Sequence, residues 1–275
     1  MHSLSKRAKE FFENKKLLFF ILNLLFIVGA FKLFQVLAFP DADFREFFTL
    51  DNMKFLFFGK SGEIGGLALT FILAIISIFI SFIIGSILGI ARYGNIKIFK
   101  YPALLFIELI RATPLIMVIF WIFFAIPVIS LSIFGVKTSA SPTVAAIIAL
   151  SIFTSAYVAE IVRAGINSIP KGQFEAAKSV GMSDTQTFLF IILPQAYRKM
   201  IPSFISQFVA LFKDTSLAYT IGVIEFFRAA TIINNRLYLS FEIFSFVALI
   251  YFSIAFSMSK YAAKLEKKVE KQLNE

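Results

Sequence analysis

Long apolar runs separated by short polar segments make up most of the chain. A helix needs about 20 predominantly apolar residues to cross the roughly 30 Å hydrocarbon core of a bilayer. Six segments meet this requirement, and each is predicted to form a membrane-spanning helix. They are residues 17–39, 64–91, 102–126, 142–167, 202–224 and 242–261. The pattern therefore predicts an all-α membrane protein with about six transmembrane helices.

The first of these segments has two interpretations. Residues 17–31 have the apolar character of a secretory signal, which would be removed from the mature protein. The apolar stretch continues past Lys32 to Phe39, however, and this favours an uncleaved first helix.

Proline and serine residues mark the expected starts of three helices. Pro102, Pro142 and Pro202 are each predicted to lie in a first helical turn, where a residue without an N–H group is tolerated. Ser141 and Ser203 are expected to cap these turns locally.

The second predicted span contains Gly85 and Gly89, at the spacing of small residues that lets two membrane helices approach closely. The pair is interpreted equally well as ordinary glycine in an apolar helix. The residues alone leave both alternatives open.

Basic residues predict the orientation of the helices, because Lys and Arg accumulate in short cytoplasmic loops. Three segments are basic: the N-terminal tail, the turn after the second span and the C-terminal tail. They contain Lys6, Arg7, Lys9, Lys15 and Lys16, then Arg92, Lys97 and Lys100, and finally Lys260, Lys264, Lys267, Lys268 and Lys271. The acidic segment 40–63 and the nearly uncharged connection around Lys137 are expected on the outer side. Both termini are therefore predicted to be cytoplasmic.

Composition agrees with a lipid environment and narrows the chemistry. Of 275 residues, 59% are hydrophobic and 16% are charged, whereas a soluble domain has about 45–50% apolar and about 25% charged residues. The absence of cysteine and the single histidine exclude disulfides, thiol nucleophiles, Cys/His zinc sites and Ser-His catalysis. The net charge of +10 is expected to face the anionic lipid of the bilayer rather than nucleic acid. We expect no catalytic residue, metal or cofactor in this chain.

The longest internal cytoplasmic segment, residues 168–200, has a helical pattern. Residues 173–180 are predicted to form a short amphipathic helix that ends at Gly181, a residue able to take the left-handed conformation. Ser183 and Gln186 form a capping box that starts a second helix, which Pro194 is expected to terminate or bend. Two short helices joined at a glycine make a compact knob. The residues alone leave it open whether this knob docks on a partner or only packs against its own helices.

Particular residues of this segment carry a specific pattern. In order they are Glu175, Ala176, Ala177, Gly181, Ile191, Leu193 and Pro194. This pattern resembles the EAA loop of permease subunits of bacterial ABC importers. The strings at 107–115, 155–177, 193–203 and 211–225 resemble the polar amino acid branch of that family.

The resemblance implies a type I ABC importer permease fold, in which this loop carries a cytoplasmic coupling helix that docks on an ABC ATP-binding subunit. It also implies an extracytoplasmic solute-binding protein, a second copy of the permease or a similar permease, and a location in the bacterial cytoplasmic (inner) membrane. The expected domains are a basic tail (1–16), an added N-terminal helix with the acidic outer segment (17–63), the permease domain (64–265) and a second tail (266–275).

Several ionisable residues fall inside the predicted spans, where a charge is costly unless it is paired or solvated. Glu108 and Arg111 stand three residues apart, as do Glu160 and Arg163, so each pair can meet on one helix face. They are interpreted either as structural ion pairs or as an inner gate. In the second case Thr113, followed by a proline, would loosen the helix.

A second charged string, from Lys213 to Ser216, is expected near the bilayer midplane, roughly 17 Å from residue 202 at about 1.5 Å per residue. Lys213 could meet the carboxylate of an amino acid and Asp214 its ammonium group, while Ser216 could supply a hydroxyl. Neighbours on a helix point about 100° apart, so both charges cannot face one small ligand without an unwound turn. The alternative is structural pairing with Glu160 or Arg111.

Taken together, these features predict a transport subunit rather than an enzyme: the permease of an ATP-driven, binding-protein-dependent importer of polar amino acids. The alternatives are a permease for another small solute, a stand-alone secondary transporter or channel, and a membrane scaffold that recruits a different soluble partner.

Overall fold

The computed structural model describes residue 29 and residues 45–274, apart from positions 61, 95 and 137–140. Its elements are α2 (Leu50–Phe58), α3 (Gly66–Tyr93), α4 (Lys97–Ala112), α5 (Leu115–Phe120), a first π-helical turn (Trp121–Ala125), α6 (Ile126–Phe134), α7 (Pro142–Asn167), α8 (Lys171–Ser179), α9 (Asp184–Gln186), a second π-helical turn (Thr187–Ile192), α10 (Leu193–Asp214), a 3-10 helix (Thr215–Ile221), α11 (Phe226–Leu237) and α12 (Ser240–Asn274). The all-α fold class is confirmed. The predicted helix at 17–39 lies outside the described residues.

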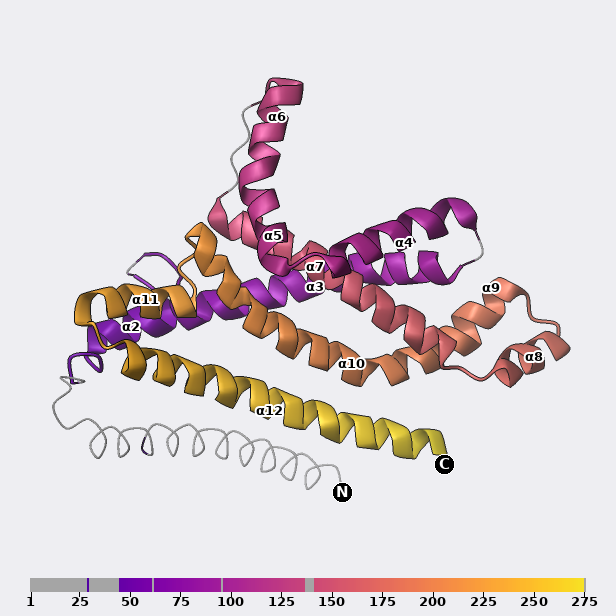
Figure 1. Ribbon diagram of the computed structural model, residues 1–275. Coiled ribbons are helices and arrows are strands. Elements are labelled where there is room, and N and C mark those ends of the chain that lie inside the picture. The colour runs from indigo at the N-terminus through magenta and orange to yellow at the C-terminus, as the bar shows by residue number, and fades with distance from the viewer. Residues whose placement is uncertain (1–28, 30–44, 61, 95, 137–140, 275) are drawn as a thin grey trace.

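Four described helical stretches are long and apolar enough to cross a membrane: Gly66–Tyr93, Leu115–Phe134, Pro142–Asn167 and Ser240–Lys267. Three of them confirm the predicted spans 64–91, 142–167 and 242–261 to within a few residues at most boundaries, although α12 extends well past residue 261. Figure 1 shows α3, α7 and α10 side by side, with α12 along one side of them. The knob of α8 and α9 lies at the same end as the turn between α3 and α4, and α2 and α11 lie at the opposite end.

The predicted third span, 102–126, is wrong in its boundaries. The helix breaks at Thr113, which has an extended backbone (φ −101°, ψ 134°), because the ring of Pro114 disfavours a helical conformation in the residue before it. Residues before the break form α4, which turns back against α3, and the apolar span comes after it at Leu115–Phe134. Pro102 lies inside α4 rather than in its first turn.

The predicted fifth span, 202–224, is not among the four described helical stretches that are long and apolar enough to cross a membrane, and its helix begins well before residue 202. Helical structure is unbroken from Asp184 to Ile221, so Pro194 does not terminate it and Pro202 lies in its interior. The π-helical turn before Pro194 changes the hydrogen-bond pattern at the point where the proline ring would otherwise clash with the preceding turn. The part from Asp184 to Asp214 is roughly 46 Å long at about 1.5 Å per residue. Of the predicted proline starts, only Pro142 is confirmed, with Ser141 accepting from the backbone N–H of Val144.

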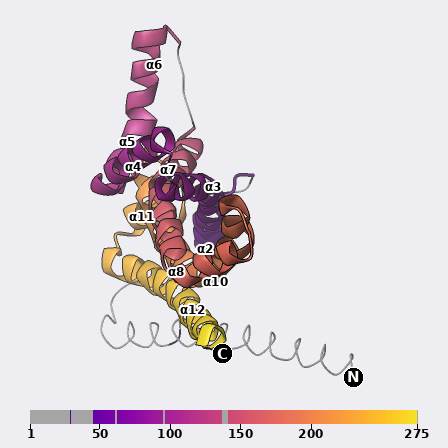
Figure 2. The same cartoon turned by 90° about the vertical axis from the view of Figure 1, so that its right-hand side faces the viewer.

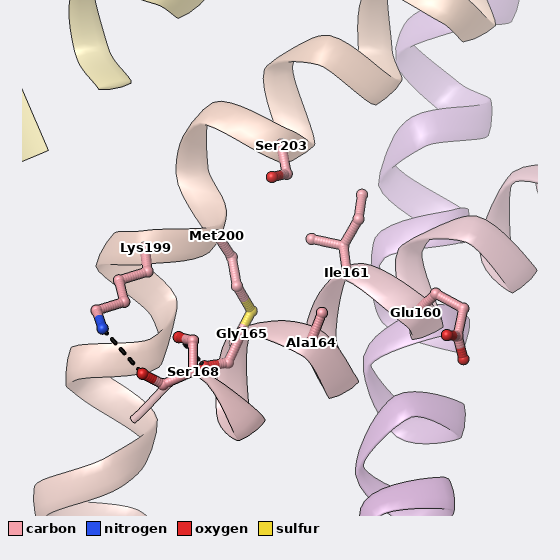
Figure 3. A pocket seen from close by; sticks show the side chains of 8 residues that line it. All are labelled: Glu160, Ile161, Ala164, Gly165, Ser168, Lys199, Met200 and Ser203. Carbon is pink, nitrogen blue, oxygen red and sulfur yellow. Dashed lines mark hydrogen bonds between the residues drawn. The ribbon is translucent and has the colours of Figure 1, made fainter. Parts of the chain in front are cut away.

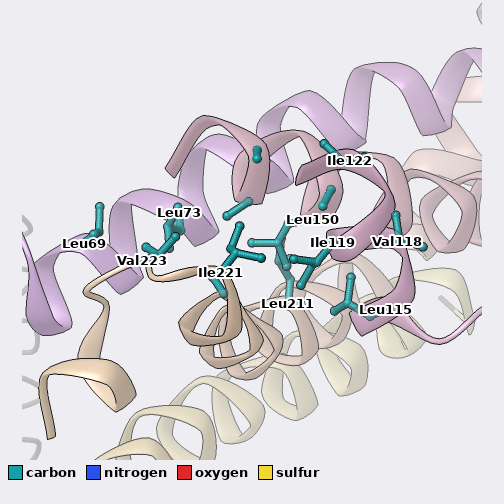
Figure 4. Packing of buried hydrophobic residues seen from close by; sticks show 14 residues of the cluster. Leu69, Leu73, Leu115, Val118, Ile119, Ile122, Leu150, Leu211, Ile221 and Val223 are labelled. Carbon is teal, nitrogen blue, oxygen red and sulfur yellow. The ribbon is translucent and has the colours of Figure 1, made fainter. Parts of the chain in front are cut away.

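The core has its centre where four helices meet. Figure 4 shows Leu73 of α3, Ile119 of α5, Leu150 of α7 and Leu211 of α10 converging in one cluster, and all four side chains are fully buried. The turned view in Figure 2 shows that α6 projects away from this bundle. No residue of α6 is buried in the described structure, so its apolar surface is left uncovered.

Gly85 and Gly89 decide how closely α3 and α7 approach. A Cβ atom at Gly85 would lie 2.6 Å from the backbone oxygen of Ser155, and one at Gly89 would lie 2.6 Å from that of Ala159. The close-approach interpretation of these glycines is therefore correct.

Candidate coupling knob and transport site

The knob has the local structure that its sequence predicted. Helix α8 is followed by Gly181 in the left-handed conformation (φ +83°). The backbone N–H of Ser183 donates to Gln186 Oε1 at 2.9 Å, and that of Gln186 donates to Ser183 Oγ at 3.3 Å, which confirms the capping box. Lys178 and Asp184 form an ion pair of 2.6 Å across the connection between the two helices.

One face of the knob is attached to the rest of the chain. Gln195 Nε2 donates to Gln173 Oε1 at 3.1 Å, and Lys199 Nζ donates to the carbonyl oxygen of Ser168 at 3.1 Å. Apolar side chains beneath it, including the buried Ile192, form a separate cluster with α7 and α10. This face of the knob therefore packs against the helices of its own chain, which was one of the two alternatives left open by the sequence.

Most of the motif residues are exposed to solvent. Glu175, Ala176, Gly181 and Pro194 are exposed, whereas Ile191 and Leu193 are half-buried. Ala177 is buried, with 5% of its surface exposed. Ala176 is therefore available to a partner, whereas Ala177 is covered by its own chain.

The charged residues of α4 and α7 form one cluster, which sequence reasoning had divided into two pairs. Glu160 binds Arg163 on its own helix (Arg163 Nη2–Glu160 Oε2, 3.0 Å), as predicted. Glu108 does not pair with Arg111; its Oε1 binds Arg92 Nη2 at 2.9 Å, and Arg92 also binds Glu160. Arg111 lies 3.8 Å from Glu160 (Nη1 to Oε2). Arg92 was predicted only as part of a basic cytoplasmic turn, because its partners Glu108 and Glu160 are remote from it in the sequence.

The cluster connects α3, α4 and α7 beside the break at Thr113, between α4 and α5. There Thr113 Oγ1 donates to the carbonyl oxygen of Leu109 at 2.8 Å. Next to the cluster, a cavity of about 500 Å³ lies between α7 and α10. Figure 3 shows Lys199 and Glu160 on opposite sides of it, with Gly165 and Met200 between them.

The string from Lys213 to Ser216 lies where the α-helix tightens into the 3-10 helix. Lys213 is exposed and Asp214 half-buried, and Ser216 Oγ donates to the carbonyl oxygen of Lys213 at 2.8 Å. Lys213 and Ser216 line a cavity of about 290 Å³ together with Tyr251 and four apolar residues, and Asp214 does not line it. The two charges diverge, as the helix geometry required. Neither pairs with Glu160 or Arg111 among the ion pairs of the described residues.

A functional candidate that sequence reasoning missed is Glu225, which is fully buried. Its carboxylate accepts from the backbone N–H groups of Phe227 (2.9 Å) and Arg228 (2.8 Å) and from the hydroxyl of Tyr251 (3.2 Å). Burial raises the pKa of Glu225 to about 7, against the lowering effect of these hydrogen bonds. Glu225 lies outside the four long apolar helices. The available signal was an acidic residue directly before an amphipathic helix.

Within the described part of the chain, no group of three or more His, Cys, Asp or Glu side chains could hold a metal ion. The candidate sites are thus the exposed surface of the knob, the charged cluster and the small cavity lined by Lys213.

Comparisons with known proteins agree on one family. The family described as "Binding-protein-dependent transport system inner membrane component" matches residues 81–271. A "Probable glutamine ABC transporter permease protein GlnP" of Bacillus subtilis is 42% identical over 227 residues, covering 82% of this chain and 98% of the relative. A "Glutamate/aspartate import permease protein GltK" of Escherichia coli O157:H7 is 33% identical, covering 74% and 91%.

Solved structures give the same picture for the fold. The "Crystal structure of an amino acid ABC transporter with histidines" contains a chain with a TM-score of 0.68 and 33% identity, covering 74% of this chain and 92% of that one. A chain of the MetNI methionine ABC transporter in an inward-facing conformation has a TM-score of 0.55 and 17% identity, covering 74% and 91%, which supports the fold alone.

Proposed function

The chain belongs to the family of binding-protein-dependent transport system inner membrane components, and on that premise we propose how it works as a permease for polar amino acids. It is a membrane transport subunit with the type I ABC importer permease fold, not an enzyme. ATP is hydrolysed in a separate ABC subunit, and a solute-binding protein delivers the solute from outside. Relatives named for glutamine and for glutamate and aspartate support the solute class.

The observation that carries this proposal is the division of the knob into an attached and a free face. The attached face is hydrogen-bonded to residues of its own chain, while Glu175 and Ala176 remain exposed at the end of the molecule. A rigid surface of this kind suits docking on the ATP-binding subunit. Glu175 is expected to meet a basic residue of that partner.

Motion of the knob reaches the transport path through one continuous helix. Helix α9 runs through the π-helical turn into α10, and α10 ends one residue after Lys213. At about 1.5 Å per residue, the Lys213 end lies roughly 40 Å from the knob along this helix. A displacement of the knob by the ATP-binding subunit is therefore transmitted to the Lys213 end. This coupling would expose the transport site alternately to the two sides of the membrane.

The docking role is tested with Glu175→Lys in the complex assembled with its ATP-binding subunit and binding protein. Glu266→Lys is the matched control, because Glu266 is also exposed but lies on α12 outside the knob. We expect Glu175→Lys to abolish ATP-dependent uptake of radiolabelled amino acid while membrane insertion is retained, and the control to transport normally. Unchanged uptake by Glu175→Lys would refute docking through this face. Uptake driven by an ion gradient without ATP would instead indicate a secondary transporter.

The cavity beside Lys213 is the proposed solute contact. Its ammonium group is exposed and, in the described structure, forms no ion pair, so it can bind a solute carboxylate, with Ser216 nearby as a hydroxyl. Asp214 does not line this cavity, so we assign it to the wall of the transport path and not to the solute contact at Lys213. Lys213→Met is expected to raise the KM for uptake more than Asp214→Asn does, and an unchanged KM for Lys213→Met would exclude this site.

The charged cluster is the proposed inner gate. Glu160 joins three helix ends, and the break at Thr113 provides a point where α4 and α5 can move relative to each other. Opening requires Arg111 and Arg92 to leave Glu160. Ile107 of α4 and Ala156 of α7 belong to one buried cluster. A disulfide between cysteines introduced at these two positions should stop uptake in the oxidised state, and reduction should restore it.

The remaining assignments concern the membrane and the second permease. The uncovered apolar surface of α6, where Val128, Leu131 and Ile133 are each more than half exposed, suits contact with lipid and with a second permease copy. The basic turn between α3 and α4 and the C-terminal end of α12 lie at the knob end, which supports a cytoplasmic location for that end and for the C-terminus. For the N-terminus, the support is the basic sequence of its tail alone.

A further inference from the structure

The cavity beside Lys213 has a wall residue that is held from behind by a buried carboxyl group. Tyr251 lines this cavity of about 290 Å³ together with Lys213, Ser216 and four apolar residues. Its hydroxyl donates to Glu225 Oε2 at 3.2 Å. The phenol ring packs between Phe212 and Phe226, with both centroid distances 5.5 Å. The position of Tyr251 is therefore defined by the aromatic contacts of its ring with Phe212 and Phe226 and by the hydrogen bond of its hydroxyl to Glu225.

Glu225 is more than a cap for α11. Caps are usually Asn, Asp, Ser, Thr or Gly, whose short side chains suffice to reach the first free N–H groups of a helix. The longer glutamate caps Phe227 and Arg228 and at the same time reaches Tyr251 on α12. A fully buried carboxyl group is costly unless its hydrogen bonds compensate. The connection to the cavity wall gives a reason for accepting this cost at position 225.

We propose that Glu225 is a positioning residue that fixes Tyr251 at the wall of the Lys213 cavity and thereby sets the affinity for the transported solute. This inference rests on the proposed function, because it requires that the cavity bind the solute. Glu225 does not touch the cavity itself; it acts through Tyr251.

The surroundings of Glu225 make this contact sensitive to pH. The groups that face the carboxyl are the hydroxyl of Tyr251 on α12, the hydroxyl of Thr70 on α3 and the two backbone N–H groups on α11. Thr215 of the 3-10 helix faces the same hydroxyl of Tyr251, and Lys213 enters the cavity from α10. No basic side chain forms an ion pair with Glu225 in the described residues. Because burial raises the pKa of Glu225 to about 7, its charge changes near neutral pH, and the strength of the hydrogen bond from Tyr251 changes with it.

The test measures KM and maximal uptake rate in proteoliposomes that contain the complete complex, with radiolabelled glutamine, glutamate and histidine, between pH 6 and pH 8. Glu225→Gln keeps the shape of the side chain, and Tyr251→Phe keeps the ring. Each is expected to raise KM about three- to tenfold at pH 8, the range for loss of one hydrogen bond, with little change in maximal rate. The double variant should be no worse than the single ones, and Glu225→Gln should remove the pH dependence of KM.

Tyr219→Phe is the matched control, because it removes a phenol hydroxyl that does not line this cavity. A lower melting temperature with unchanged KM in both Glu225→Gln and Tyr251→Phe would overturn the inference and leave Glu225 as a cap. If Lys213→Met raises KM while those two variants do not, only this inference fails. If Lys213→Met also leaves KM unchanged, the proposed transport site fails and the inference fails with it.

Discussion

Replacing Gly85 with alanine tests the packing on which the whole bundle depends. The new Cβ would lie 2.6 Å from the backbone oxygen of Ser155 and 2.6 Å from the side chain of Val158. A backbone oxygen cannot rotate away, so α3 and α7 would have to separate. Overpacking of this kind costs about 1–3 kcal/mol, while alanine regains at most about 1 kcal/mol of helix propensity. Because one of these contacts is with backbone, the upper part of the overpacking range applies, and we expect a net loss of about 1–2 kcal/mol for Gly85→Ala.

The assay is thermal unfolding of the detergent-solubilised protein, followed by circular dichroism at 222 nm. A loss of that size should lower the melting temperature by roughly 2–8 °C for a chain of this length. Gly172→Ala is the matched control, because a Cβ there meets nothing within 4 Å and α8 should gain stability. Gly165→Ala is a second comparison, since the three atoms nearest to its Cβ would all belong to the flexible side chain of Met200. A Gly85→Ala protein that melts at or above the wild-type temperature would refute the reasoning.

Four other substitutions address the charged cluster, the knob and the core. Glu160→Ala leaves three arginines without their shared carboxylate and should lower the free energy of unfolding by about 3 kcal/mol. Glu108 has 54% of its side chain exposed, so Glu108→Ala should lower it by about 1 kcal/mol or less in the same melting experiment. Equal losses would contradict the assignment of Glu160 as the centre of the cluster. Ser183→Ala should lower the local stability of the knob by about 0.5–2 kcal/mol, which would be measured as faster hydrogen exchange of the backbone amides in α9. Unchanged exchange would argue against the cap. Leu150→Ala should lower the free energy of unfolding by about 2–5 kcal/mol. A loss below about 1 kcal/mol would show that the core collapses into the space left by the removed side chain.

Local features of the knob were predictable because they depend on residues close together in the sequence. The left-handed conformation of Gly181 needs only the absence of a Cβ atom. The capping box needs only Ser183 and Gln186 at the right spacing. The same is true of the cap at Ser141 before Pro142. These elements have the same structure in almost any fold, and their sequence signals are correspondingly specific.

The helix boundaries that failed involve competition between local and tertiary preferences. Pro102 and Pro202 favour helix starts in isolation, yet both lie inside helices of the folded chain. Thr113 became a break because the proline after it restricts its backbone directly. An interior proline loses one hydrogen bond. Pro202 is buried, so packing of α10 compensates for that loss, whereas Pro102 is exposed on α4.

By itself, therefore, the sequence determined the membrane class, the extents of α3 and α7 and the geometry of the knob. The tertiary structure alone decided which face of the knob is free, that Arg92 rather than Arg111 pairs with Glu108, and that Glu225 reaches Tyr251. The physical reason is distance along the chain. Helix and turn preferences act within a few residues, whereas the partners of a buried charge are fixed only when separate helices pack and exclude solvent.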